Sequence, residues 1–209
     1  MLYLRQPKPE RIREWLDDQS SQAITHAHLC GTHDESMPVR FHHIDFQNVL
    51  GRGQNVYETA VLAMQQWNSF HLPWTQTIFD GTPQVGHQLA VVAKVLGTWS
   101  VNCCRVVATN RGHIDERTGD QTWSFTIGTL PRHMAIGEEQ VSVTLQHETG
   151  DVIYGIRSFS RPGNLLIKIA TPIVRRQQAR FCDESAKSMR RFIRANDRLP
   201  ATEDRVFSV

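Results

Sequence analysis

The sequence has few cysteines, no long apolar run and little net charge. Four cysteines in 209 residues are too few for a disulfide framework. Cys103 and Cys104 are neighbours in an expected strand, where their side chains point to opposite faces. No apolar segment approaches the roughly 20 residues that span a bilayer, and the start MLYLRQPKPE lacks the apolar core of a secretory signal. A formal net charge of +2 gives no firm indication of nucleic-acid binding. We therefore expect a cytoplasmic protein without a transmembrane segment.

An ordered series of helices and strands is what the sequence does contain. Residues 9–20 and 55–67 carry apolar side chains at helical spacing. Alternating apolar and polar residues, separated by turn residues, predict strands near 39–51, 73–79, 86–96, 100–109, 121–129, 138–147 and 151–161. A last helix runs from about residue 165 to residue 196, and its apolar stripe consists of Ala179, Cys182, Ala186, Met189 and Ile193.

This order of elements predicts an α+β fold. Strands joined by short turns form an antiparallel meander, and one face of such a sheet needs a cover. We expect a curved antiparallel sheet of about seven strands wrapped around the long C-terminal helix, with a short N-terminal helix. The arrangement resembles the helix-grip fold of START-like proteins. We divide the chain into a helical arm with an irregular segment at 1–38, one helix-grip-like domain at 39–198 and a tail at 199–209.

The last predicted hairpin indicates which side chains face the helix. If ETGD forms a two-residue turn, Glu148 opposes Asp151 and the register of the ladder follows. The inward face then consists of apolar residues and ends in the polar Glu139 and Ser160. Such a face is typical of a small-molecule pocket, and a filled core is the alternative. The inward residues are Leu89, Val91, Ala93, Val95, Trp123, Phe125, Ile127, Val141, Val143, Leu145, Tyr154, Ile156 and Ser158.

Several short motifs occur in a fixed order along the chain. Gly51 and Gly53 precede a helix that ends in Trp67, and the strand motif CRVV follows at 104–107. GTLPRHMAIGEE occupies 128–139, and the last strand ends in RSFSRP at 157–162. Together these motifs resemble the DUF1990 family, also called UPF0548, from about Gly31 to the end of the final helix. The family has no established activity, so the resemblance implies no reaction.

Our leading hypothesis is a protein that binds an apolar or amphipathic small molecule between the sheet and the C-terminal helix, without a cofactor. The loop that contains His133 would gate the mouth of the site. The sequence leaves the identity of the ligand and the oligomeric state open. The expected ligand-binding residues are Trp123, Thr129, Leu130, Pro131, His133, Glu139, Tyr154 and Ser158.

Two other functions are consistent with the same sequence. In the first, a cyclase- or hydrolase-type enzyme uses His133 and Glu139 as an acid–base pair. No nucleophile is placed beside His133, however, and a hydrogen-bonded turn with Glu138 in solvent explains the same residues. In the second, an interaction module uses the arginine-rich final helix, with Arg175, Arg176, Arg180, Arg190, Arg191, Arg194 and Arg198.

The segment HAHLCGTHDE at 26–35 has the composition of a metal site. His26, His28 and Cys30 point the same way in an extended chain, and these residue types are suitable zinc ligands. The segment lacks the paired C-x-x-C or H-x-x-x-H spacing that structural zinc sites use on a firm element. We therefore interpret it as a histidine-rich surface loop and expect no bound metal.

Overall fold

The structure is a computed structural model that describes residues 2–33, 37–79, 81–95 and 97–196. Asp34 and Glu35 of the histidine-rich segment, Arg198 and the predicted tail at 199–209 lie outside the described residues. The elements are β1 (Leu2–Tyr3), α1 (Pro9–Asp17), β2 (His42–Arg52), α2 (Gln54–Gln65), η1 (Asn68–Phe70), β3 (Thr75–Phe79), β4 (Gln88–Val95), β5 (Thr98–Ile114), β6 (Gln121–Thr129), β7 (Ala135–Leu145), β8 (Asp151–Pro162), α3 (Leu165–Ile169) and α4 (Thr171–Asn196).

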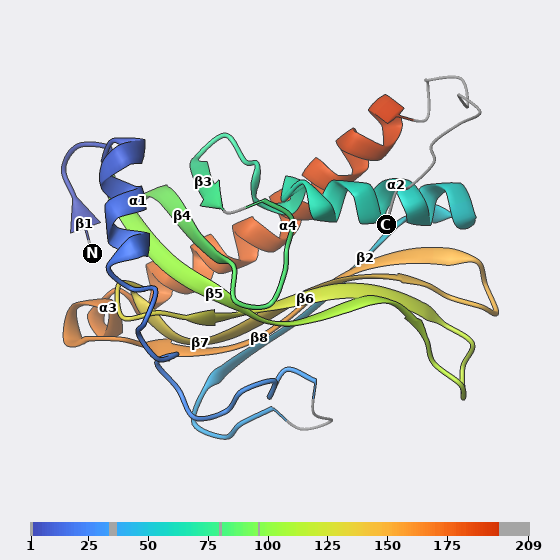
Figure 1. Ribbon diagram of the computed structural model, residues 1–209, viewed down its shortest axis with the longest axis horizontal. Coiled ribbons are helices and arrows are strands. Elements are labelled where there is room, and N and C mark those ends of the chain that lie inside the picture. Colours follow the sequence, from blue (N-terminus) through green and yellow to red (C-terminus); the bar gives the residue numbers. More distant parts are fainter. Residues whose placement is uncertain (1, 34–36, 80, 96, 197–209) are drawn as a thin grey trace.

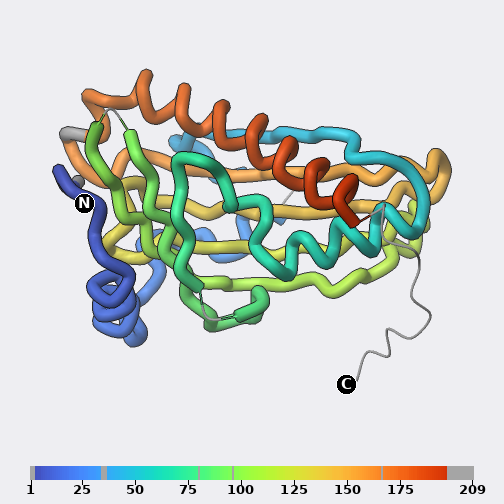
Figure 2. The backbone as a smooth tube through the Cα atoms, turned by 90° about the horizontal axis from the view of Figure 1, so that it is seen from above, coloured from blue at the N-terminus to red at the C-terminus, as the bar shows by residue number. Residues whose placement is uncertain are grey.

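Seven strands form one antiparallel sheet in the order β2-β8-β7-β6-β5-β4-β3, and β1 pairs with β5 beside this path. The first long strand therefore lies next to the last one. Helix α4 runs along one face of the curved sheet, with α2 beside it (Figures 1 and 2). The predicted α+β fold, a curved antiparallel sheet around a long C-terminal helix with a short N-terminal helix, is confirmed. Among the described helices, none is long and apolar enough to cross a membrane.

The main core lies between the sheet and the second half of α4. It includes Trp67, Phe125 and Met189, all fully buried. Of the predicted apolar stripe on the final helix, Cys182, Ala186, Met189 and Ile193 are buried, whereas Ala179 is exposed. The expectation for Ala179 was wrong because it lies at the border of the stripe, and in this part of α4 Val174 and Gln178 face the sheet instead.

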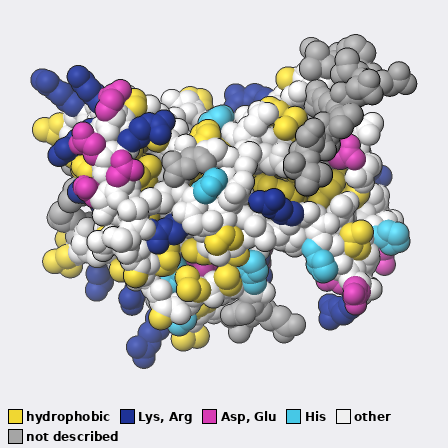
Figure 3. Space-filling model, in the orientation of Figure 1, with side chains coloured by type: hydrophobic (Ala, Val, Ile, Leu, Met, Phe, Trp, Pro, Cys, Tyr) yellow, Lys and Arg dark blue, Asp and Glu magenta, His cyan; other side chains and the backbone are white. Residues whose placement is uncertain are grey.

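Helix α1 covers the opposite face of β4 and β5, where a second apolar cluster includes Trp15, Val92 and Cys103. Cys104 belongs to the main core, so the two adjacent cysteines do point to opposite faces. The guanidinium of Arg105 donates hydrogen bonds to the carbonyl oxygens of residues 19, 20 and 22, which follow α1. Acidic and basic side chains intermingle over the outer surface of this end of the molecule (Figure 3).

The histidine-rich segment is a loop, and it is fastened to the outer face of the sheet. The carboxylate of Glu138 on β7 accepts hydrogen bonds from the backbone N–H of Cys30 (2.8 Å) and from both the N–H (3.0 Å) and the hydroxyl (2.8 Å) of Thr32. Glu138 is 3 % exposed and Thr32 is fully buried. The alternative that placed Glu138 in solvent was wrong, because this loop covers the strand.

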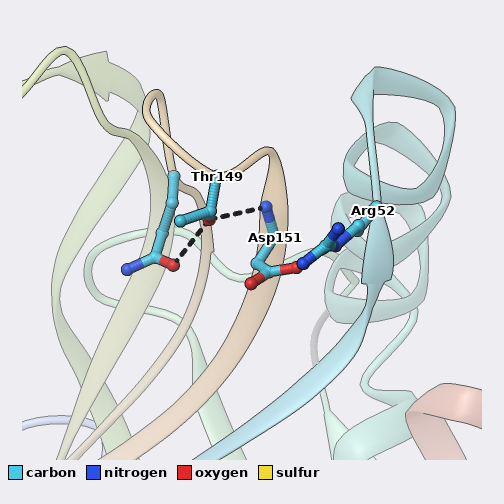
Figure 4. A network of polar contacts seen from close by, with 4 residues as sticks. Arg52, Thr149 and Asp151 are labelled. Carbon is cyan, nitrogen blue, oxygen red and sulfur yellow. Dashed lines mark hydrogen bonds and ion pairs between the residues drawn. The ribbon is translucent and has the colours of Figure 1, made fainter.

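The β7–β8 hairpin has a longer turn than predicted. Leu145 pairs with Val152, and the backbone N–H of Gln146 donates to Asp151, so four residues form the loop. The predicted pair of Glu148 and Asp151 was therefore wrong by two residues. Asp151 instead forms an ion pair with Arg52 at the end of β2, at 2.6 Å, while Thr149 bridges the loop (Figure 4). A shift of two residues keeps each side chain on the same face of the strand. The prediction of which residues face inward is therefore correct despite the wrong register.

Candidate functional site

A cavity of about 350 Å³ lies between the sheet and the first half of α4. On the sheet side its wall includes Val91 and Ala93 of β4, both assigned to the inward face from the sequence. On the helix side it includes Val174, Phe181 and Cys182. The packed core continues the same interface toward the C-terminal half of α4. The fold therefore fills one end of the space beneath α4 and leaves the other end hollow.

Strand β5 adds a polar strip to the cavity wall. Ser100, Asn102 and Cys104 alternate along the strand and all line the cavity. The amide of Asn102 donates hydrogen bonds to the backbone oxygen of Val91 and to the hydroxyl of Ser100, each at 3.2 Å. These residues were missing from the predicted site. The alternation of the strand could have predicted them, because every second residue of a strand lies on the same face and Ser100 and Asn102 therefore share the face of Cys104.

Glu139 is the ionisable group on the inner face of the sheet within this cavity. Its pairing with Ile127 and Ser158 directs the side chain inward, and its remaining exposed surface faces the cavity. Among the residues that the structure describes, none donates a hydrogen bond to its carboxylate. Burial alone raises the pKa of Glu139 from 4.5 to about 7. The group is therefore partly protonated near neutral pH.

The surroundings of Glu139 are apolar or weakly acidic. Burial raises the pKa of Cys182 to about 12, and the charge of Glu139 is the next cause. Burial also raises the pKa of Cys104 and of Tyr154, with the same carboxylate contributing to both. The hydroxyl of Tyr154 is hydrogen-bonded to Ser185 of α4. No described cation neutralises Glu139.

His133 lines the cavity but is not tuned by Glu139. Its Nδ1 atom lies 2.9 Å from both the backbone oxygen and the backbone nitrogen of Ala135, in the turn between β6 and β7. Burial lowers the pKa of His133 to about 4, so the imidazole is neutral at pH 7. Between the described atoms of His133 and Glu139 there is no hydrogen bond. The geometry thus supports the reading of His133 as a turn-forming residue rather than the partner of Glu139.

The remaining predicted site residues divide between the cavity and the packed interior. Thr129 and Ser158 line the cavity with His133 and Glu139. Trp123 and Tyr154 lie in the main core cluster. Leu130 belongs to the second cluster, beneath α1, and Pro131 is exposed. The structure therefore brings four of the predicted residues to the cavity: Thr129, His133, Glu139 and Ser158.

The histidines of the histidine-rich segment contact neighbouring side chains, and both ring nitrogens of His26 are buried without a hydrogen-bond partner among the described residues. The rings of His26 and His28 lie edge-on to Phe159, at 5.3 and 6.2 Å between centroids. His33 forms a hydrogen bond of 2.8 Å through Nε2 with Thr126 of β6. Within the described part of the chain, no group of three or more histidine, cysteine or acidic side chains is arranged to hold a metal ion.

Comparison with known proteins identifies the family. The model of DUF1990, described as a domain of unknown function, matches residues 25–188. The chain belongs to the DUF1990 family. The resemblance seen in the sequence motifs is thereby confirmed. The matched DUF1990 region starts in the loop that Glu138 fastens and ends within α4, so it contains the sheet, the cavity and most of the covering helix.

Two relatives carry the alternative family name UPF0548. The UPF0548 protein of Dictyostelium discoideum is 26 % identical over 215 residues, which cover 95 % of this chain and 99 % of the relative. The protein of Arabidopsis thaliana is 29 % identical over 153 residues, covering 71 % of each chain. Among solved structures, the Zhui aromatase/cyclase from Streptomyces sp. R1128 is 11 % identical, with a TM-score of 0.49 over 78 % of this chain and 99 % of that one. Similarity of this degree carries no argument about ligand or reaction.

The raised pKa of Glu139 predicts a pH-dependent stability. Between about pH 4.5 and 7 the folded state holds a proton that the unfolded state has lost, so stability falls as pH rises through this window.

We expect Glu139→Gln to raise the free energy of unfolding at pH 8 by about 2 kcal/mol and to change it little at pH 4. The expected gain is smaller than the value that the pKa shift alone gives, because water in the cavity solvates the carboxylate. Urea denaturation across this range checks the prediction. Glu148→Gln, in the exposed turn, is the control. Parallel pH profiles for wild type and Glu139→Gln would contradict it.

Proposed function

We propose that this DUF1990 protein binds an apolar or amphipathic small molecule in the cavity between the sheet and α4. The observation that carries the proposal is a largely apolar cavity of about 350 Å³ that contains the unpaired carboxyl group of Glu139. Small-molecule sites are concave and mostly apolar, with a few placed polar groups. A solidly packed interior is the usual state of a domain core, so a hollow of this size beneath a long helix favours a ligand.

The environment of Glu139 also supports ligand binding. Glu139 is only partly buried, but burial raises its pKa to about 7, so its charged form is disfavoured in the empty cavity. A ligand with a hydroxyl, amine or amide group near Glu139 would supply a hydrogen-bond partner. Ser158, on the adjacent strand, offers a second polar contact at the same level of the sheet. These residues would orient the ligand, while the apolar walls supply most of the binding free energy.

One observation favours a second candidate function, an enzyme that uses Glu139 alone as its general base. A carboxyl group with a pKa of about 7 is suited to proton transfer at neutral pH. The proposed acid–base pair with His133 has no such support, because the imidazole is bonded to its own turn. The interaction module has less support still, since Arg180 pairs with Glu184 and Arg190 with Asn48. A cytoplasmic location remains a prediction from the sequence.

Native mass spectrometry of protein purified under mild conditions tests the proposal. We expect a co-purifying small molecule at near-stoichiometric amount, released on denaturation. Titration with the neutral fluorescent probe N-phenyl-1-naphthylamine provides the second measurement. A bare mass together with no binding of this probe would contradict a ligand-binding cavity.

Filling part of the cavity should weaken binding without unfolding the protein. Ala93 lies on the inward face of β4 and is 8 % exposed. We expect Ala93→Phe to occupy part of the hollow and to weaken binding of N-phenyl-1-naphthylamine about tenfold or more, because a factor of ten corresponds to only about 1.4 kcal/mol. Ala179→Phe, on the exposed side of α4, is the matched control. Circular dichroism confirms that both variants fold, and equal probe affinity in the two would place the binding site elsewhere.

A further inference from the structure

A second hollow, of about 380 Å³, adjoins the cavity where the start of β2, the end of β8 and the start of α4 meet. This is the end of the molecule at which α3 joins α4, at the left of Figure 1. The two spaces share several lining residues, which form the neck where they adjoin. The shared residues are Ala135, Ser160, Ile167, Val174 and Gln178. At this neck the amide of Gln178 donates a hydrogen bond of 3.2 Å to the hydroxyl of Ser160.

The second hollow is lined by positive charge. Its lining residues include Arg40 from the turn before β2, Arg161 of β8 and Arg175 of α4, and the described part of its wall contains no acidic residue. None of the three arginines forms an ion pair with a described residue, in contrast to Arg52 and Arg157, which pair with Asp151 and Asp45. All three arginines are exposed, so the hollow presents positive charge that an anion from solvent can reach.

The positions of the charged side chains also fit an anion. The guanidinium of Arg161 lies over the ring of Phe41, with its central carbon 5.2 Å from the ring centroid. His42 lies in the same wall, and its pKa is lowered first by burial and then by the charge of Arg175. His43 is held by a bond from Nε2 to the backbone oxygen of Pro38. A guanidinium group presents planar pairs of donors that match a carboxylate or a phosphate, and the ring of Phe41 supports the guanidinium of Arg161.

We propose that the ligand of the cavity is an amphipathic anion whose carboxylate or phosphate head group is bound by Arg40, Arg161 and Arg175. The apolar part then extends past Gln178 into the cavity. This inference rests on the proposed function and adds the chemical class and the orientation of the ligand. The opposite orientation is less favourable, because it would place the anionic head beside the acidic Glu139 and away from the three arginines.

Calorimetric titration with three dodecyl compounds tests the head group, each below its micelle concentration. We expect dodecanoate to bind about tenfold more tightly than neutral 1-dodecanol, since a charge-assisted bond contributes at least this factor, and the preference to shrink as salt is added. Dodecyl phosphate distinguishes the two head-group chemistries: the tighter of the two anions identifies the natural class. Equal affinity for dodecanoate and dodecanol would overturn the inference while leaving the cavity as a binding site.

The arginine variants locate the head group. Arg161→Gln combined with Arg175→Gln is expected to remove the preference for dodecanoate and to leave the affinity for dodecanol unchanged. The control is Arg176→Gln, because Arg176 is the next residue of α4, is exposed and does not line the hollow. Dodecanoate binding that is equal in the double variant and the control would overturn the inference. Failure of all three compounds to bind would overturn the proposed function, and this inference with it.

Discussion

Gly137→Ala is expected to lower the free energy of unfolding by about 4 kcal/mol. A methyl group at this position of β7 would lie 2.0 Å from the backbone oxygen of Phe159 and 2.8 Å from the Cα atom of Ser160. Both atoms belong to the backbone of β8, so no side-chain rotation relieves the overlap. The two strands would have to separate at the level of the cavity.

Gly155→Ala is the matched control for this experiment. It lies on β8 in the same strand pair, and its added methyl group would meet the hydroxyl of Ser142 at 2.7 Å. Because a serine side chain rotates, we expect a loss of about 1 kcal/mol or less. Equilibrium denaturation in urea compares the two variants. Equal losses would show that the close approach of β7 and β8 at Gly137 is not the cause.

Glu138→Ala is expected to destabilise the protein by about 4 kcal/mol, because it leaves the buried N–H and hydroxyl of Thr32 and the partly buried N–H of Cys30 without an acceptor. All three donors belong to Cys30 and Thr32, so the loop at 25–33 should detach from the sheet. Amide hydrogen exchange reports this directly. Exchange of the amides of Cys30 and Thr32 should accelerate at least 100-fold, a factor that corresponds to about 2.8 kcal/mol.

The exposed Glu148 provides the control for this second experiment. Glu148→Ala removes the same charge from the hairpin turn, where the carboxylate lies in solvent, and should change stability by less than about 0.5 kcal/mol. Normal protection of Cys30 and Thr32 in Glu138→Ala would contradict the assigned role. The loop would then be held by its ring contacts with Phe159 and by the hydrogen bonds of His33 with Thr126 and of Thr25 with Thr129.

Most of the fold was predictable because it depends on periodicity. In the six long strands apolar and polar residues alternate, and in the final helix apolar residues recur at helical spacing. These patterns predicted the positions of the elements to within a few residues. The β7–β8 register was wrong by two residues, yet the inward face was right, since strands return to the same side every second residue. Turn length, in contrast, depends on local bonds such as those of Thr149, which composition does not reveal.

The candidate site was less predictable for two physical reasons. Alternation shows which side chains of the sheet face the helix. Whether they pack against the helix or leave a cavity depends on the volumes of the side chains on both the sheet and the helix. Tyr154 meets Ser185 in the filled half, whereas Ser158 faces the hollow half of the same strand. Similarly, the buried state of Glu138 depends on a loop more than 100 residues away in the sequence. No pattern within β7 contains that information.

The pairing of β2 with β8 has a consequence for the order of folding. His42 pairs with Ser160, so the edge strand that forms first during synthesis gains its partner only when nearly the whole sheet has been made. Pairings this distant in the sequence form slowly. Helix α4 follows β8 and can close the cavity only afterwards. We therefore expect the hollow beneath α4 to be the last part of the molecule to assemble, so that a newly made chain offers its binding surface to a ligand before the helix covers it.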